Sequence, residues 1–215
     1  MDERKDRRTG TAGVGRPRDP QVDEAILSAT RELLVECGYQ KTTITAIARR
    51  AKLGTAAIYR RWAARESIIE DAIFGMQDVA LPEATDDLHA DLLAWTRMFL
   101  VRIAEPATRA AIPGLLSAYH SDDGVYERLV TRSEAPARAA LTARVAAAFP
   151  ERSDDTNTAV SDAAFDLLMA ATTMRGLTSG LADADTFCAR TAESLTLLVT
   201  VDRADTAADR SSSRT

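Results

Sequence analysis

Hydroxyl and cationic side chains gather within residues 43–65, at spacings that suit contact with a nucleic acid. Thr55 and Ala56 are followed one helical turn later by Tyr59 and Arg60, so a helix here would carry all four on one face. A threonine hydroxyl can donate or accept at a base edge, and the methyl groups of threonine and alanine can touch a thymine methyl. An arginine can reach a guanine or a phosphate. The alternative is a half-buried core tyrosine beside solvated arginines.

Phosphate contacts are expected on either side of this face. Thr43 and Thr45 open another short helix, whose N–H groups and hydroxyls can donate to a phosphate. Arg16 and Arg18 lie in a glycine-rich basic arm, residues 1–18, which is expected to be disordered. Arginines in such an arm suit a narrow minor groove.

The distribution of charge favours a polyanionic partner for the first third of the chain. Residues 1–65 contain 14 Lys and Arg against 8 Asp and Glu, whereas residues 66–215 contain 13 against 24. Chance clustering of surface charge would give the same totals, so the charge supports the motif and does not replace it.

The first helix predicted to position these side chains begins at Asp19, a capping residue, with Pro20 in its first turn. Gly38 is expected to end it, with Tyr39 folding back as an apolar contact. Its buried stripe follows the i, i+3, i+4, i+7 rule and comprises Ile26, Leu27, Thr30, Leu33, Leu34 and Cys37.

Two further short helices complete a helix-turn-helix plan. The second follows Thr42-Thr43, a break covers residues 51–54, and the third runs from about residue 55 to 62. Ile58 and Trp62 lie one turn apart and are expected to be buried.

The rest of the chain also has helical periodicity, and no segment alternates like a strand. Helices are predicted near 64–78, 86–104, from Pro106, 123–148, 158–178 and 184–201. Pro113-Gly114 is expected to bend or break the helix that Pro106 starts, and Pro136 to kink the next one. The predicted fold is all-α, with a three-helix helix-turn-helix DNA-binding domain followed by a helical-bundle ligand-binding and dimerisation domain. The expected boundaries are 1–18 for the arm, 19–65 and 66–202 for the two domains, and 203–215 for a disordered tail.

Residues 15–74 resemble the DNA-binding domain of the TetR/AcrR family of regulators. The resemblance rests on Gly-Arg-Pro-Arg at 15–18, Gly38-Tyr39, Thr-Thr-Ile before the second helix, Ala-Ile-Ala within it and Ile-Tyr-Arg-Arg-Trp at the end of the third. It implies a homodimeric repressor that binds a palindromic operator in double-stranded DNA and is released by a small, largely apolar effector. It also implies that the Tyr59 hydroxyl, and Arg65 at the start of the fourth helix, contact the DNA backbone.

Three positions depart from the pattern of this family. Lys52 and Gly54 stand where the family usually has glycine and then serine, and Arg61 stands where histidine is common. Lys52 is therefore expected to adopt a positive φ, and Gly54 to cap the third helix without a hydroxyl. All three are included among the candidate DNA-contacting residues.

Aromatic and methionine side chains in the C-terminal two-thirds indicate a ligand site between helices. The candidates are Trp95, Met98, Phe99, Ile103, Tyr119, His120, Phe165, Met169, Thr172 and Thr173. The alternative for each apolar side chain is ordinary core packing. Arg175 lies in an apolar helix and would need an acidic partner, either a ligand anion or a carboxylate of the protein.

The last two helices are predicted to form a four-helix interface with a two-fold mate. The candidate interface residues are Leu168, Thr172, Phe187, Leu195, Leu198 and Val199. The alternative is that both helices bury these side chains within one subunit.

No catalytic motif, cofactor site or metal cluster is recognisable in the sequence, so no enzyme activity and no cofactor are expected. Cys37 and Cys188 lie in apolar patterns, which favours buried reduced thiols over a redox pair. No apolar run reaches about 18 residues and no secretory signal is present, so a cytoplasmic protein without a membrane partner is expected. Two alternative functions remain. One is an architectural DNA-binding protein that has no effector, and the other is a transcriptional activator.

Overall fold

The computed structural model describes residues 19–75, 81–121, 127, 131 and 134–201, and within these ranges every regular element is a helix. The prediction of an all-α fold is confirmed. The basic arm with Arg16 and Arg18, and the tail from residue 203, lie outside the described residues. Among the described helices none is long and apolar enough to cross a bilayer, and the same residues hold no group of three His, Cys, Asp or Glu that suits a metal ion.

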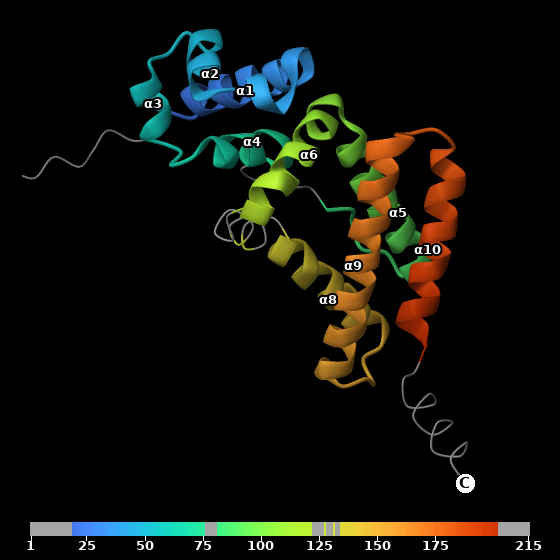
Figure 1. The fold of residues 1–215 in the computed structure, drawn as a ribbon. Helices are drawn as coiled ribbons and strands as arrows, with labels where there is room; N and C mark the ends of the chain where they lie inside the picture. The colour runs from blue at the N-terminus through green and yellow to red at the C-terminus, as the bar shows by residue number, and fades with distance from the viewer. Residues whose placement is uncertain (1–18, 76–80, 122–126, 128–130, 132–133, 202–215) are drawn as a thin grey trace, which may run out of the picture.

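Four helices form an N-terminal unit, here called the head (residues 20–74; Figure 1). They are α1 (Pro20–Lys41), α2 (Ile44–Arg50), α3 (Thr55–Tyr59) and α4 (Arg65–Phe74). The Asp19 carboxylate caps α1 by accepting from the Gln21 N–H at 3.0 Å, as the sequence predicts. The order of three helices followed by α4 confirms the helix-turn-helix plan, although α3 ends at Tyr59 rather than near residue 62.

Gly38 ends the regular part of α1. Its φ of 76° and ψ of 175° lie outside the helical region, which a residue without a Cβ adopts readily. The chain then turns so that Tyr39 is buried, as predicted. Cys37 differs from the expectation because it is only half-buried, with its Sγ 3.1 Å from the Leu33 carbonyl oxygen, whereas Cys188 is fully buried.

The described C-terminal helices form the body (residues 88–200), which lies below the head in Figure 1. They are α5 (Leu88–Ala104), α6 (Pro106–Ser121), α8 (Ala135–Ala148), α9 (Asp154–Thr178) and α10 (Ala184–Thr200). Helices α5, α9 and α10 pack against one another, and α8 packs on α9. Helix α6 lies between the two units, because it contacts α1 and α4 as well as α5.

Two predicted boundaries were wrong for local reasons. Helix α4 ends at Phe74 rather than near residue 78, because Gly75 takes a φ of 84° and leaves the helix. Helix α9 begins at Asp154, four residues before the predicted start, because the Ser153 hydroxyl accepts from the Thr156 N–H at 3.2 Å.

Both prolines expected to disturb helices are accommodated. Helix α6 continues through Pro113, so the expected break is wrong. The neighbouring Gly114 lies against α1, where an added Cβ would be 2.1 Å from Cδ1 of Tyr39, so tertiary packing holds α6 at this point. Pro136 stands in the first turn of α8, and most of the preceding residues, which a kink at Pro136 would involve, lie outside the described part of the chain.

Helix α4 is shared by two hydrophobic clusters. One face places Ile68 and Ala72 in the head cluster, together with Ile26, Ile47, Ile58 and Trp62. The other face places Ile69 and Ile73 against α6, in a junction cluster that includes Leu34, Tyr39, Ile103, Ile112 and Leu115. Helix α4 therefore packs on both the head and α6.

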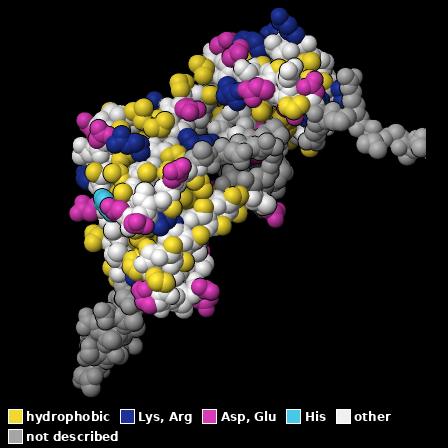
Figure 2. All heavy atoms as spheres, turned by 180° about the vertical axis from the view of Figure 1, so that it is seen from behind, with side chains coloured by type: hydrophobic (Ala, Val, Ile, Leu, Met, Phe, Trp, Pro, Cys, Tyr) yellow, Lys and Arg dark blue, Asp and Glu magenta, His cyan; other side chains and the backbone are white. Residues whose placement is uncertain are grey.

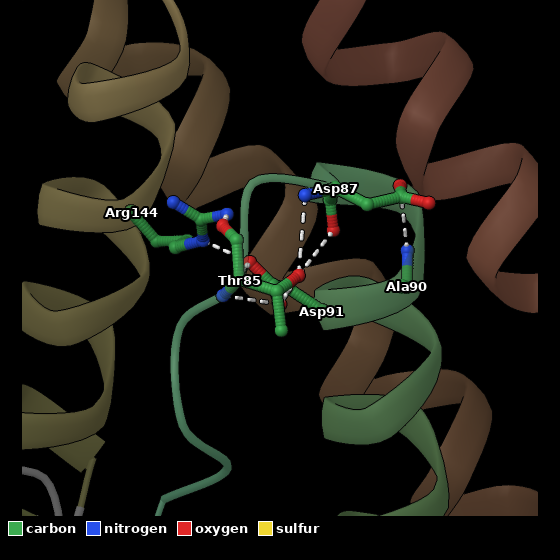
Figure 3. A network of polar contacts seen from close by, with 5 residues as sticks. All are labelled: Thr85, Asp87, Ala90, Asp91 and Arg144. Atoms are coloured by element: carbon green, nitrogen blue, oxygen red, sulfur yellow. Dashed lines mark hydrogen bonds and ion pairs between the residues drawn. The ribbon is translucent and has the colours of Figure 1, made fainter.

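A polar network centred on the buried Asp91 fastens the segment before α5 to the body (Figure 3). The Asp91 carboxylate is buried and accepts from the Thr85 N–H at 3.0 Å and from the Thr85 hydroxyl at 2.7 Å. Arg144 of α8 donates to the same carboxylate and to the Thr85 carbonyl. Asp87 caps α5 by accepting from the Ala90 N–H at 3.0 Å. The segment that connects the head to the body is therefore fixed at Thr85 to both α5 and α8.

Candidate nucleic-acid interface

The start of α2 and the turn after it have the geometry that the sequence predicts. The Thr43 hydroxyl accepts from the Ala46 N–H at 3.1 Å, and both Thr43 and Thr45 are exposed. Lys52 adopts a φ of 57°, so the expected positive φ is confirmed. Gly54 caps α3 without a side-chain hydrogen bond, again as expected.

Helix α3 presents one face to solvent and the other to the head cluster. Thr55, Ala56 and Arg60 are exposed, and Tyr59 keeps 59% of its surface exposed, so Tyr59 is not a core residue. Ile58 is buried on the opposite side. The predicted reading face is therefore assembled on a short helix whose buried side anchors it.

Trp62, directly after α3, fixes the helix to α4. Its side chain is buried, and its indole Nε1 donates to Oδ2 of Asp71 at 2.6 Å. This buried hydrogen bond satisfies the one polar atom of the indole and orients the segment that follows α3.

Arg61 and Arg65 are placed differently from the other candidates. Arg61 forms an ion pair with Asp23 of α1, with both side chains largely buried, and also donates to the Ala57 carbonyl at 3.1 Å. Arg65 donates to Glu66 at 2.9 Å and to the Tyr39 carbonyl at 3.4 Å. The structure thus commits both guanidinium groups to contacts within the head.

Tyr39 is the centre of the contact between α1 and α4. The Arg65 guanidinium lies 4.3 Å from the Tyr39 ring centroid, and the Tyr39 hydroxyl donates to Oε1 of Glu66 at 3.2 Å. Burial raises the pKa of the Tyr39 hydroxyl, which therefore stays a donor at neutral pH. The sequence analysis identified the turn at Tyr39 but not this junction, because its partner Gly114 stands 75 positions away.

Only part of the candidate ligand set comes together. Phe99 links Trp95 and Phe165, with ring centroids 6.2 and 5.9 Å apart, and Met169 packs on the same cluster. Trp95 and Phe165 are buried, and Met98 and Phe99 are half-buried. This aromatic cluster lies between α5 and α9.

The other candidate ligand-binding residues lie away from the aromatic cluster, are exposed, or form hydrogen bonds within their own helix. Ile103 and Tyr119 belong to the junction cluster, and burial beside Glu70 raises the pKa of the Tyr119 hydroxyl. His120 is exposed, and the buried Thr172 hydroxyl donates to the Leu168 carbonyl at 2.7 Å. Thr173 is half-buried.

Arg175 is occupied within the protein and finds no acidic partner among the described residues. It donates to the Ala182 carbonyl and lies over the Phe187 ring, 5.4 Å from its centroid. It therefore fastens the loop between α9 and α10, so the partner expected from the sequence is replaced by a carbonyl and an aromatic ring.

A cavity of about 370 Å³ lies at the junction between the end of α1 and α6. Its lining comprises Cys37, Gly38, Tyr39, Gln40, Ala110, Pro113, Gly114 and Ser117. None of the predicted ligand residues belongs to this lining, so the cavity and the aromatic cluster are separate places in the fold.

Four of the six candidate interface residues are buried within the protomer. Leu168, Thr172, Leu195 and Val199 are at most 2% exposed, and Phe187 and Leu198 are half-buried. These four side chains therefore point into the body core, which is a correction to their placement. Other apolar side chains of the same helices are exposed: Leu167 and Met174 on α9, and Leu197 on α10, are 55%, 66% and 60% exposed.

Comparisons with known proteins agree with this architecture. Residues 26–72 match the family described as bacterial regulatory proteins, tetR family, and residues 82–195 match the tetracyclin repressor-like C-terminal domain. The second match alone covers more than half of the 215-residue chain.

Named relatives and structures point the same way. The chain is 32% identical over 124 residues to the HTH-type transcriptional regulator YdeS of Bacillus subtilis, a match that spans 58% of this chain and 63% of that protein. Salmonella enterica GusR has a similar structure, with a TM-score of 0.63 and 23% identity over 84% of this chain and 96% of that one. A single-residue variant of TetR from Acinetobacter baumannii, in complex with minocycline, has a TM-score of 0.52 and 16% identity over 86% and 95%.

The two matched segments correspond to the head and the body, and they appear in the same order as in the fold described above. The chain belongs to the TetR family of bacterial regulatory proteins.

Proposed function

We propose that the chain is a ligand-responsive transcriptional repressor that binds a palindromic operator in double-stranded DNA as a homodimer. In this proposal residues 19–65 bind DNA, and residues 66–202 bind the effector and dimerise. The observation that carries it is the exposed face of α3, where Thr55, Ala56, Tyr59 and Arg60 project from a helix anchored by Ile58.

The test is selection of a duplex by the full chain from a randomised DNA library, followed by titration of the selected duplex. We expect a near-palindromic site and an affinity that falls steeply with salt, because neutralised phosphates release counterions. Tyr59→Phe weakens binding to every sequence, and Thr55→Ala changes the preferred sequence. Equal affinity for the selected and a random duplex at physiological salt would contradict the proposal.

The homodimer is supported by the exposed apolar side chains of α9 and α10. Leu167, Met174 and Leu197 are each more than half exposed. Large apolar side chains that are exposed on neighbouring helices usually mark an interaction surface. A two-fold mate would cover them and would hold two α3 helices about 34–36 Å apart, one turn of DNA. Sedimentation at micromolar concentration distinguishes this dimer from a monomer.

A small, largely apolar effector is proposed to bind in the body near the aromatic cluster of Trp95, Phe99, Phe165 and Met169. The neighbour from Acinetobacter baumannii was solved with minocycline, and that complex supports a small-molecule ligand for a protein of this fold. Helix α4 offers the route to DNA, because its two faces pack on α6 and on the head. A ligand that moves α6 would therefore tilt α4 and weaken DNA binding.

The measurement is a thermal-shift screen of apolar compounds, followed by DNA release for each compound that raises the melting temperature. Linkage requires that DNA weakens effector binding by the same factor, which is typically about 5–150-fold. Compounds that bind the body without any change in operator affinity would remove the inducible part of the proposal.

An architectural DNA-binding protein without an effector is the second candidate. The observation that favours it is the packing of the aromatic cluster, because Trp95 and Phe165 already fill their site as core residues. Tight binding to the selected duplex, combined with the absence of any stabilising compound, would support this candidate.

A further inference from the structure

The basic residues of the head fall into two groups. Among residues 19–75 the chain has eight Lys and Arg, and four of them form ion pairs with carboxylates of the head. The paired residues are Arg31, Arg50, Arg61 and Arg65. The other four are exposed and have no ion pair or side-chain hydrogen bond with any residue in the described part of the chain: Lys41, Arg49, Lys52 and Arg60.

The paired arginines connect the helices of the head. Arg50 of α2 donates to Glu32 at 3.0 Å and to Glu36 at 2.8 Å, both on α1. Arg61 joins the end of α3 to Asp23 of α1 in the same way. These cations are already neutralised, and a phosphate would have to compete with a carboxylate for each of them.

Arg49 lies beside Arg50 in the sequence but on a different side of α2. Ile47 and Ala48 face the core, whereas Thr45 and Arg49 are four positions apart and share the exposed face. Lys52 follows three residues later, in the turn that leads to α3. Thr45, Arg49 and Lys52 are therefore exposed side chains that lie along the segment from the start of α2 to the turn before α3.

We infer that Arg49 contacts a DNA phosphate and, with Lys52, extends the DNA-binding surface from α3 along α2. This inference rests on the proposed DNA-binding function and adds a residue to it. Arg50, its neighbour in the chain, is instead a positioning residue that holds α2 on α1. Figure 2 shows Lys and Arg side chains next to Asp and Glu side chains on the head, which is the pattern expected where cations are paired with carboxylates of the same unit.

The test compares Arg49→Gln with the matched control Arg50→Gln in the full chain, on the duplex that the wild-type chain selects from a random library. Each phosphate contact contributes about 0.9 to the slope of log affinity against log salt concentration, so its loss from both heads of a dimer reduces the slope by about 1.8. We expect this reduction for Arg49→Gln, with equal weakening on cognate and random duplexes and an unchanged melting temperature. Arg50→Gln is expected to lower the melting temperature and to keep the wild-type slope.

The outcomes separate the inference from the function it rests on. A wild-type chain that binds its selected duplex, together with an Arg49→Gln variant of unchanged slope, overturns the inference and leaves the DNA-binding proposal standing. An equal loss of slope in Arg50→Gln overturns the division of the cations into two groups. A wild-type chain that selects no duplex overturns both proposals.

Discussion

At the residue scale, the turn between α2 and α3 is held by a lysine where the backbone favours glycine. Lys52 has a φ of 57°, a region in which a Cβ is strained. We expect Lys52→Gly to raise the free energy of unfolding by about 1 kcal/mol, measured by urea denaturation. Lys52→Ala is the control, because it removes the charge but keeps the Cβ. An equal gain in both variants would show that charge, and not backbone strain, sets the effect.

Glu134, at the start of α8, gives a prediction that depends on pH. Burial raises the pKa of the Glu134 carboxyl above its ordinary value of 4.5, although the Arg138 guanidinium opposes the shift. The folded state therefore binds a proton more tightly than the unfolded state, and stability falls as the pH rises from the unfolded pKa through the folded one.

Glu134→Gln should consequently raise the melting temperature at pH 7 and leave it unchanged below about pH 4, where the wild-type carboxyl is protonated. Arg138 keeps Asp162 at 3.5 Å and Asp166 as partners in this variant, so it is not left uncompensated. A lower melting temperature at pH 7 would mean that the pair with Arg138 outweighs the cost of burial. Thermal melts at the two pH values make the comparison.

Local signals were sufficient to predict the backbone geometry of the helix-turn-helix and insufficient to predict which distant side chains pair with one another. The cap at Asp19, the stop at Gly38 and the positive φ of Lys52 each depend on a few neighbouring residues, and each was predicted. Arg61 was included among the DNA-contacting candidates from its position in the family pattern, and nothing in the sequence connects it to Asp23, which lies 38 positions away. Arg49 was missed, although its spacing of four from Thr45 was the available signal.

At the element scale, tertiary contacts explain where predictions from local sequence were wrong or left alternatives open. Pro113-Gly114 predicted a bend or a break in α6, but the helix continues through Pro113 and is held against α1 by the contact of Gly114 with Tyr39. The apolar stripes of α9 and α10 were recognised, but periodicity cannot distinguish a face buried within the subunit from one buried against a partner. The structure resolves this for Leu168 and Leu195, which pack inside the body.

The Gly114 contact gives a direct test of the junction between head and body. An alanine Cβ would lie 2.1 Å from Tyr39 Cδ1, so Gly114→Ala forces the tyrosine or α6 to move. We expect a loss of about 1–3 kcal/mol in the free energy of unfolding, which is typical of overpacking. Gly54→Ala is the matched control, because its Cβ would meet nothing within 4 Å. A smaller loss at Gly114 than at Gly54 would contradict the close contact.

The C-terminus of α4 is held from both sides by arginines. Arg31 of the head donates to the Ala72 carbonyl at 3.2 Å, and Arg102 of α5 donates to the Phe74 carbonyl at 2.6 Å. Positively charged groups at this end of a helix also interact favourably with its dipole. Helix α4 is thus anchored to the body by the Arg102 hydrogen bond as well as by the junction cluster.

Removal of this anchor should loosen α4 without disrupting the body. We expect Arg102→Gln to cost about 1.5–3 kcal/mol, the range for hydrogen bonds that involve a charged group. Hydrogen exchange of the α4 amides should accelerate more than exchange in α9. Arg109→Gln is the control, since Arg109 donates to the Leu177 carbonyl at 3.2 Å within the body. Equal acceleration in both variants would show that Arg102 has no special role at the junction.

At the scale of the whole molecule, the charge is divided as the proposed function requires. The first 65 residues carry a net positive charge, and the remainder is acidic. An acidic body is repelled by DNA, so a dimer would approach the duplex with its two heads first. The exposed apolar side chains of α9 and α10 lie on the body, where a second copy can cover them away from the duplex.

The last prediction joins dimerisation to DNA binding. Leu197 is 60% exposed on α10, so replacing it with glutamate is compatible with the folded protomer but places a charge in the proposed interface. We expect Leu197→Glu to sediment as a monomer at micromolar concentration, with a melting temperature that no longer depends on protein concentration. Because a monomer engages only one half-site, the variant should lose most of its preference for the palindrome, and its salt slope should fall to about half the wild-type value.

The control for this prediction is Leu116→Glu on α6, where a leucine of similar exposure, 54%, lies outside the proposed interface. It should remain a dimer and keep the wild-type slope, which separates a specific interface from a general effect of adding charge. A Leu197→Glu protein that is still dimeric would move the interface away from this face of α10. A monomeric Leu197→Glu protein with the full wild-type affinity for the palindrome would instead show that one protomer is sufficient for recognition, and the two-fold mechanism would have to be abandoned.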